Sequence, residues 1–143
     1  MNNSFYYRLW LSLRMWIIAL LVNTVVGAFY LMHSFPHQLT RFWQYAELGI
    51  CWGAIFSFPI MLTVLYTLGN CIYAGKTGKQ VLQTIFLWVF VVTSLMFFLF
   101  WVIISVGLPS ILIVLFGISL LSGSIGIGSH YRSLLRCGAD YKR

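Results

Sequence analysis

The chain has almost no acidic residues. Glu47 and Asp140 are the only two among 143 residues, and charged residues of both signs make up only 8%. A soluble domain typically uses about 25% charged residues to cover its surface. Hydrophobic residues make up 61% of this chain and aromatic residues 18%. Because so few polar groups cannot shield this chain from water, lipid must surround most of it, and we predict an integral membrane protein.

Four apolar runs are long enough to cross a membrane, for which a helix needs about 20 residues. They cover residues 15–35, 48–68, 85–106 and 109–128. The first run is too long for the apolar part of a cleavable signal peptide, and no small-residue cleavage site follows it. The predicted fold is therefore a single all-α domain of four transmembrane helices.

The positions of the basic residues predict the orientation, because cytoplasmic loops carry an excess of lysine and arginine. Apart from Arg41, all of them precede the first span, lie between the second and third, or follow the fourth. We therefore expect both termini in the cytoplasm, with the inner (plasma) membrane of a bacterium as the location. Anionic lipid headgroups, rather than nucleic acid, are the expected partners of the +7 net charge. The cations expected to contact them are Lys76, Lys79, Arg132 and Arg136.

Two segments outside the spans carry further predictions. In residues 4–14, Phe5, Leu9 and Leu13 recur at helical spacing with Arg8 between them. This pattern is typical of a helix that lies along the membrane surface, and we expect it to precede the first span. Residues 130–143 are predicted to form a basic cytoplasmic tail.

The stretch GNCIYAGKTG, residues 69–78, contains the Gly-Lys-Thr triplet that ends many phosphate-binding loops. In those loops four residues separate the first glycine from this triplet, and a β-strand precedes the loop. Here five residues separate Gly69 from Gly75, and a membrane helix precedes them. We predict a turn between two helices and no nucleotide.

Patterns of cysteine and histidine that would indicate catalysis are missing. The cysteines occur singly, at Cys51, Cys71 and Cys137. The histidines, His33, His37 and His130, are divided between the two sides of the predicted membrane. A haem held by two helices needs histidines at the same depth, so His33 and His130 cannot hold one together. His33 and His37 straddle a proline and have no carboxylate beside them, which is unfavourable for zinc. We therefore expect no catalytic, metal or cofactor site.

Polar and small residues inside the first two spans predict close helix packing. Gly49, Gly53 and Ser57 recur every four residues and form one face of the second span, a pattern that lets helix backbones approach. Asn23 lies near the middle of the first span, one turn from Gly27. A buried amide in hydrocarbon is costly without a hydrogen bond, so Asn23 should face another helix or a cavity. Whether the partner helix belongs to the same chain stays open.

The fourth span is unusually rich in glycine and serine. Four of these residues share one face at helical spacing: Ser119, Ser122, Gly126 and Ser129. One interpretation is a tightly packed helix at the centre of the bundle. The other is a helix that lines a narrow polar path for a solute.

Two functions from different classes fit these patterns. The first is a narrow channel or pore formed by self-assembly, because four helices in 143 residues leave little room for a path within one chain. The second is an accessory subunit that docks on a larger membrane complex through the Gly49 and Gly53 face. A small transporter is a third possibility. None of these is an enzyme.

Overall fold

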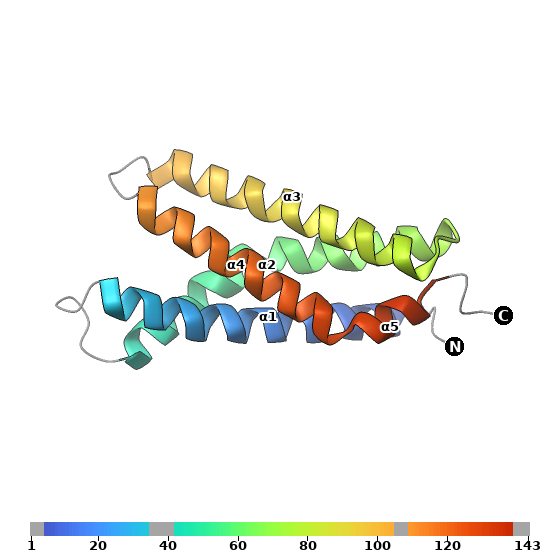
Figure 1. Ribbon diagram of the computed structural model, residues 1–143, viewed down its shortest axis with the longest axis horizontal. Coiled ribbons are helices and arrows are strands. Elements are labelled where there is room, and N and C mark those ends of the chain that lie inside the picture. Colours follow the sequence, from blue (N-terminus) through green and yellow to red (C-terminus); the bar gives the residue numbers. More distant parts are fainter. Residues whose placement is uncertain (1–4, 35–41, 105–108, 139–143) are drawn as a thin grey trace.

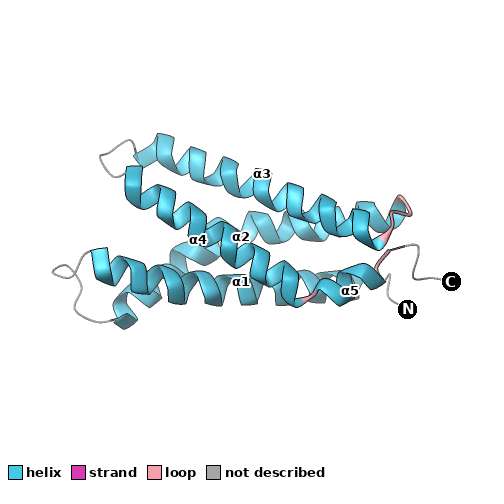
Figure 2. Ribbon diagram, in the orientation of Figure 1, coloured by secondary structure: helices cyan, strands magenta, loops and turns pink. Residues whose placement is uncertain are grey.

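The computed structural model describes residues 5–34, 42–104 and 109–138. These residues form four long helices, α1 (Phe5–Ser34), α2 (Phe42–Tyr73), α3 (Gly78–Ile104) and α4 (Pro109–Ser129), and the short α5 (Tyr131–Arg136) (Figures 1 and 2). Each long helix is long and apolar enough to cross a membrane. The prediction of an all-helical protein with four such helices is confirmed. His37, Arg41, Asp140 and the end of the expected basic tail lie outside the described residues.

The four long helices form a ring. α1 packs on α2 and on α4, while α3 also packs on α2 and α4, and the diagonal pairs make little contact. The start of α1, the short helix α5 and the turn between α2 and α3 lie at one end of the bundle, which we call the terminal end (Figure 1). The opposite end, where α1 and α3 stop, we call the loop end. Towards the loop end, α3 and α4 diverge from α1 and α2 (Figure 1).

The first helix differs from its prediction. The sequence predicts a separate surface helix over residues 4–14, but residues 5–14 form one continuous helix with the first span, α1. Leu11 and Ser12 are buried, so one side of this part of α1 packs against the bundle, while Phe5, Tyr6 and Trp10 are exposed. Farther towards the N-terminus, the Arg8 guanidinium lies directly over Gly69 of α2. A Cβ atom on Gly69 would lie 2.5 Å from Arg8 Nη1. Glycine at position 69 thus leaves room for the Arg8 side chain beside α2.

The main hydrophobic core fills the terminal end of the bundle. This core also includes α5, whose Leu134 is completely buried. Gly78, at the start of α3, lies against the Leu135 carbonyl of α5. A Cβ atom on Gly78 would lie 2.5 Å from that oxygen, so glycine permits this close approach. The core residues are Leu11, Met15, Val64, Leu68, Cys71, Val81, Ile85, Val89, Ile127, Leu134 and Cys137. This core closes the terminal end.

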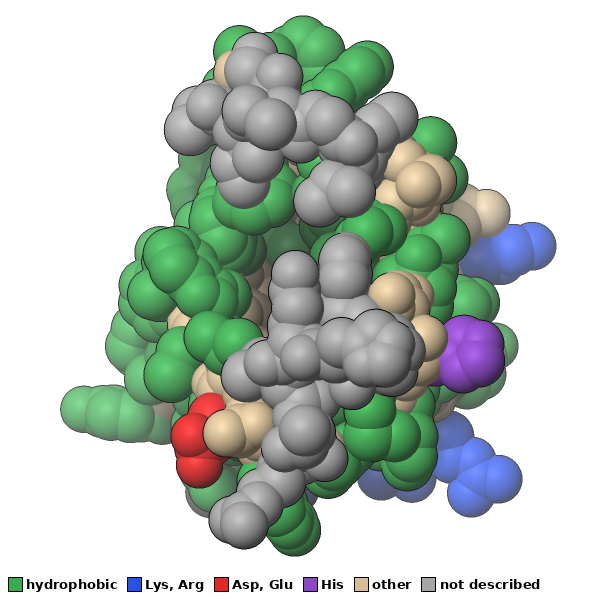
Figure 3. Space-filling view, turned by 90° about the vertical axis from the view of Figure 1, so that its left-hand side faces the viewer, with side chains coloured by type: hydrophobic (Ala, Val, Ile, Leu, Met, Phe, Trp, Pro, Cys, Tyr) green, Lys and Arg blue, Asp and Glu red, His purple; other side chains and the backbone are tan. Residues whose placement is uncertain are grey.

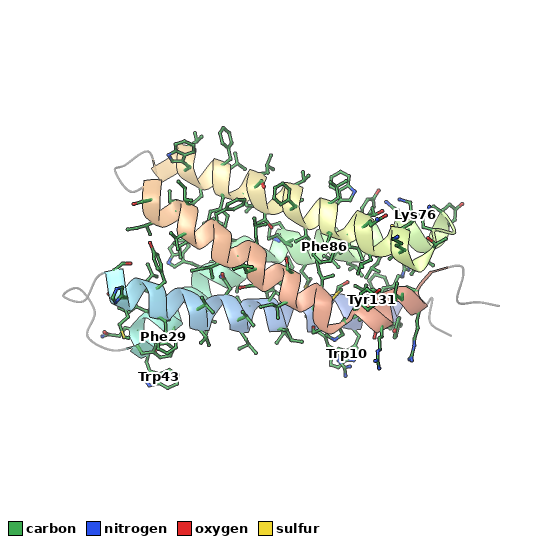
Figure 4. The ribbon with its side chains drawn as sticks, in the orientation of Figure 1. Trp10, Phe29, Trp43, Lys76, Phe86 and Tyr131 are labelled. Carbon is green, nitrogen blue, oxygen red and sulfur yellow. The ribbon has the colours of Figure 1, made fainter. Side chains whose placement is uncertain are left out.

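The outer surface exposes large apolar side chains from several helices. Trp10, Phe29, Trp43 and Phe86 are examples (Figure 4). The third helix buries one stripe at four-residue spacing, which contains Val81, Ile85, Val89 and Thr93. Water would disfavour such a surface, whereas lipid tails solvate it. The surface is thus that of a membrane protein.

The turn after α2 begins with a helix C-cap. Gly75 has a φ of 65°, a left-handed conformation that glycine adopts without a steric penalty. Its N–H donates to the Ile72 carbonyl at 3.2 Å, and the Lys76 N–H donates to the Cys71 carbonyl at 3.0 Å. These two bonds form a Schellman motif. A phosphate loop would direct such N–H groups at its nucleotide, but here they close α2.

A capping box then starts α3. The Gln80 N–H donates to the Thr77 hydroxyl at 3.4 Å, and the Thr77 N–H donates to Gln80 Oε1 at 3.0 Å. This reciprocal pair is the arrangement in which threonine and glutamine three residues apart satisfy the first N–H groups of a helix. In the Gly-Lys-Thr triplet, Gly75 and Lys76 therefore belong to the C-cap of α2, and Thr77 is the N-cap of α3.

Candidate binding cavity

A cavity of about 520 Å³ lies inside the ring of long helices. It follows α1 from Ser12 to Leu31, which is roughly 28 Å at the rise of an α-helix. All four long helices contribute to its wall. Viewed from the loop end, the molecule has a shaded recess near its centre (Figure 3). The cavity therefore extends along the bundle from the core at the terminal end towards the loop end.

The described wall of the cavity carries no acidic or basic side chain and no histidine. Most of it is aliphatic or aromatic, with Phe56, Phe97 and Phe100 among the aromatic residues. Phe56 of α2 and Phe100 of α3 meet edge to face with ring centroids 5.0 Å apart. An ion in such surroundings would lose its hydration without compensation. The wall favours an uncharged molecule.

The predicted role of Asn23 is partly explained by a contact with α4. The Ser119 hydroxyl donates to Asn23 Oδ1 at 3.2 Å, and both residues line the cavity. Within the described residues, the Asn23 Nδ2 group makes no hydrogen bond. Asn23 therefore faces both a helix and a cavity, and its amide group retains two N–H donors for a bound molecule.

The predicted packing face of α2 meets α1 of the same chain. A Cβ atom on Gly49 would lie 3.5 Å from Thr24 Cγ2, and one on Gly53 would lie 3.0 Å from Leu20 Cδ1. Ser57 accepts a hydrogen bond of 2.8 Å from the Trp16 indole N–H. The partner helix that the sequence left open is thus α1, and the same face of α2 also borders the cavity.

Gly27 does not have the packing role that the sequence predicts. It is buried, yet a Cβ atom at this position would have no other atom within 4 Å, and Gly27 lines the cavity. The missing side chain leaves space that α2 does not fill. Gly27 therefore enlarges the cavity instead of bringing two backbones together.

The four residues expected along a polar path divide into three environments. Ser119 and Ser122 line the cavity, although the Ser122 hydroxyl is used in a 2.7 Å bond to the Ile118 carbonyl. Gly126 lies at the crossing of α4 with α1. Ser129 is exposed at the end of α4, where its hydroxyl donates to the Gly126 carbonyl at 2.8 Å. The four residues do not form one continuous lining.

Two buried hydroxyl groups in the cavity wall have no partner among the described residues. They belong to Ser12 and Thr24, whose side chains are 1% and 5% exposed. Leaving a buried hydroxyl without a hydrogen bond costs about 1–3 kcal/mol. Thr24 and Trp16 also line the cavity, and neither residue was predicted from the sequence to have a role there. A tryptophan N–H within a span needs an acceptor, and this requirement could have identified Trp16.

The expected headgroup contacts lie near the terminal end. Lys79, Arg132 and Arg136 are exposed, whereas Lys76 is half-buried and donates to the Thr84 hydroxyl at 3.2 Å. Among the described residues, no group of histidine, cysteine or acidic side chains could hold a metal ion.

Comparisons of the chain with models of protein families, with curated proteins and with solved structures found no match. A function has to be assigned from the cavity and the surface of this chain.

Proposed function

We propose that the protein binds one uncharged, mostly apolar small molecule in the central cavity. The supporting observation is the wall itself, which has no charged side chain in its described part but presents the Asn23 amide N–H groups. Small-molecule sites commonly combine a largely apolar wall with a few polar groups that fix orientation, in volumes of about 300–1,000 Å³. The expected ligand carries a hydrogen-bond acceptor, such as a hydroxyl or carbonyl oxygen, for the Asn23 donors.

Access to the cavity is proposed from the loop end. The core around Leu68 and Leu134 closes the terminal end, whereas the cavity wall continues to Leu31 and Tyr45 near the loop end. Movement of the ligand across the whole bundle would require this core to open. Binding is therefore the function proposed here, and it would be the first step of transport in a small transporter.

The two functions that the sequence favoured have less support. A pore between copies of the chain would not be lined by Asn23, Ser119 or Ser122, because these residues line the interior of one chain. Docking on a larger complex through Gly49 and Gly53 would require α1 to leave that face. The cavity also removes the reason for assuming self-assembly, since one chain does contain internal space.

We also propose that the termini lie in the cytoplasm and that the membrane is the bacterial inner membrane. The described basic residues belong to the terminal half of the bundle, while Glu47 lies near the loop end. The described basic residues are Arg8, Arg14, Lys76, Lys79, Arg132 and Arg136. The excess of positive charge at one end supports this orientation. The cavity would then be reached from the outer side.

Probe binding to cavity-filling variants tests the proposal. We suggest 1-aminoanthracene, a fluorescent aromatic amine that is uncharged at pH 7, with purified protein in detergent. Gly27→Leu should weaken saturable binding at least tenfold, because the new side chain extends into the cavity. Gly117→Leu is the matched control, because a Cβ atom there also has no atom within 4 Å but Gly117 does not line the cavity. This variant should bind like the wild type.

The charge of the ligand is tested by competition. An anthracene sulfonate of similar size carries a permanent charge and should not displace the bound amine. Thermal unfolding of both glycine variants checks that each is folded. Equal binding by wild type, Gly27→Leu and Gly117→Leu would mean that the probe only partitions into the micelle, and the proposal would be wrong.

A further inference from the structure

A second hollow lies on the outside of the bundle, between α2 and α3, and shares no residue with the central cavity. Its volume is about 620 Å³. It is bounded by one face of α2, one stripe of α3 and the turn between them. The residues are Leu62, Thr63, Tyr66, Thr67, Asn70, Cys71, Ala74, Lys76, Thr84, Trp88 and Val92. We call it the α2–α3 groove.

The end of the α2–α3 groove at the turn is polar and positively charged. Lys76 Nζ donates to the Thr84 hydroxyl at 3.2 Å, and that hydroxyl donates to the Gln80 carbonyl at 2.7 Å. Thr84 thus fixes the ammonium group beside the groove, while two of the three ammonium N–H groups make no described hydrogen bond. The nearby Asn70 is exposed and adds an amide. Figure 4 shows Lys76 at this terminal end of the bundle.

The opposite end of the groove is apolar. Leu62 and Val92 bound it, and the aromatic residues Tyr66 and Trp88 line it between the two ends. Tyr66 is 72% exposed and Trp88 is 48% exposed, so both side chains are available to a molecule in the groove. From Thr84 to Val92 the wall rises roughly 12 Å along α3. The groove therefore passes from a cationic end at the turn after α2 to an apolar end farther along α2 and α3.

We propose that the α2–α3 groove binds one anionic phospholipid from the adjacent leaflet. The lipid phosphate would accept charge-assisted hydrogen bonds from Lys76, and an acyl chain would lie between Tyr66 and Trp88. The local charge favours an anionic lipid over a zwitterionic one, because the described part of the terminal end carries cations and no acidic side chain. This site does not depend on the function proposed for the central cavity.

Native mass spectrometry of the full-length, delipidated protein tests the site. Dioleoylphosphatidylglycerol and dioleoylphosphatidylcholine are titrated separately, since they share acyl chains and differ in net charge. The wild type should bind one phosphatidylglycerol about fivefold more tightly than phosphatidylcholine, the factor expected for one lysine at an anionic surface. Lys76→Ala should reduce this preference to about onefold, and Lys76→Arg should restore most of it.

Lys79→Ala is the matched control, because Lys79 lies three residues along the chain, carries the same charge and does not line the groove. It should keep the fivefold preference. Equal losses in Lys76→Ala and Lys79→Ala would overturn the proposal by indicating attraction to surface charge alone. Inorganic phosphate should not displace the lipid at equal concentration. Displacement would show a site for a soluble anion and would also contradict the proposal.

Discussion

Gly126 of α4 lies directly against the Met15 carbonyl of α1. A Cβ atom on Gly126 would be 2.6 Å from that oxygen and 3.1 Å from the Ala19 Cβ atom. Real Cβ atoms do not come so close to a backbone oxygen, so any side chain here must push the two helices apart. This contact joins α1 and α4 beside the closed end of the cavity. The lack of a side chain at Gly126 therefore sets how closely α1 and α4 approach.

Gly126→Ala should destabilise the protein by about 1–3 kcal/mol, the usual cost of overpacking. Gly128→Ala is its control, because a Cβ atom at Gly128 would have no atom within 4 Å. Alanine there should be neutral or stabilise the helix by up to about 1 kcal/mol. Unfolding of the purified protein in mixed micelles, followed by circular dichroism against denaturant concentration, measures both. Equal stability of the two variants would show that the α1–α4 contact is not tight.

The sequence predicts the four helices because hydrophobic length is a local property. It does not predict that α1 starts as early as Phe5, because the packing of Arg8 beside Gly69 of α2 joins residues far apart in the chain. Glycines illustrate the same limit. Gly27 and Gly126 look alike in the sequence, but one borders empty space and the other touches a backbone. Which of the two environments a glycine has depends on the neighbouring helix, and spacing alone does not contain that information.

Removing the unpaired hydroxyl of Thr24 should stabilise the ligand-free protein. Thr24→Val keeps the shape of the side chain and eliminates a buried group that has no described partner. The free energy of unfolding should rise by about 1–3 kcal/mol. Thr63→Val is the contrasting variant, because the Thr63 hydroxyl donates to the Pro59 carbonyl at 2.8 Å. It should lose stability or stay unchanged. A clear loss of stability in Thr24→Val would show that its hydroxyl has a partner.

The two helix caps at the turn should each contribute to stability. Gly75→Ala forces a side chain into the left-handed conformation, which costs about 1 kcal/mol. Thr77→Ala removes the acceptor of the capping box, at about 0.5–2 kcal/mol. Hydrogen exchange at the start of α3 should accelerate in Thr77→Ala. Lys79→Ala, an exposed change in the first turn of α3, should leave that exchange unchanged.

Burial raises the pKa of the Cys137 thiol. Its sulfur is buried at the end of α5 and donates to the Ser133 carbonyl at 3.3 Å. The folded state disfavours the thiolate. The contribution of the Cys137 thiol to the free energy of unfolding is therefore fully present below the ordinary thiol pKa of about 8.5, and it declines as pH rises above that value. Cys137→Ser should weaken this alkaline loss of stability. Unfolding measured from pH 7 to pH 10 gives the two profiles, and identical slopes would contradict the prediction.

The proposed orientation can be tested with two cysteines at opposite ends of the bundle. Trp43→Cys places a thiol near the loop end and Tyr131→Cys places one on α5, at positions that are 73% and 48% exposed in the native protein. Both are made in a background where the three native cysteines are replaced by alanine or serine. With the termini in the cytoplasm, a membrane-impermeant maleimide added to intact cells should label residue 43 and not residue 131. Permeabilised cells should label both, which shows that each thiol is reactive.

Labelling of residue 131 alone in intact cells would reverse the orientation, and the cavity would then be reached from the cytoplasm. Labelling of both in intact cells would mean that the two ends of the bundle lie on the same side, and the arrangement of spans proposed here would be wrong.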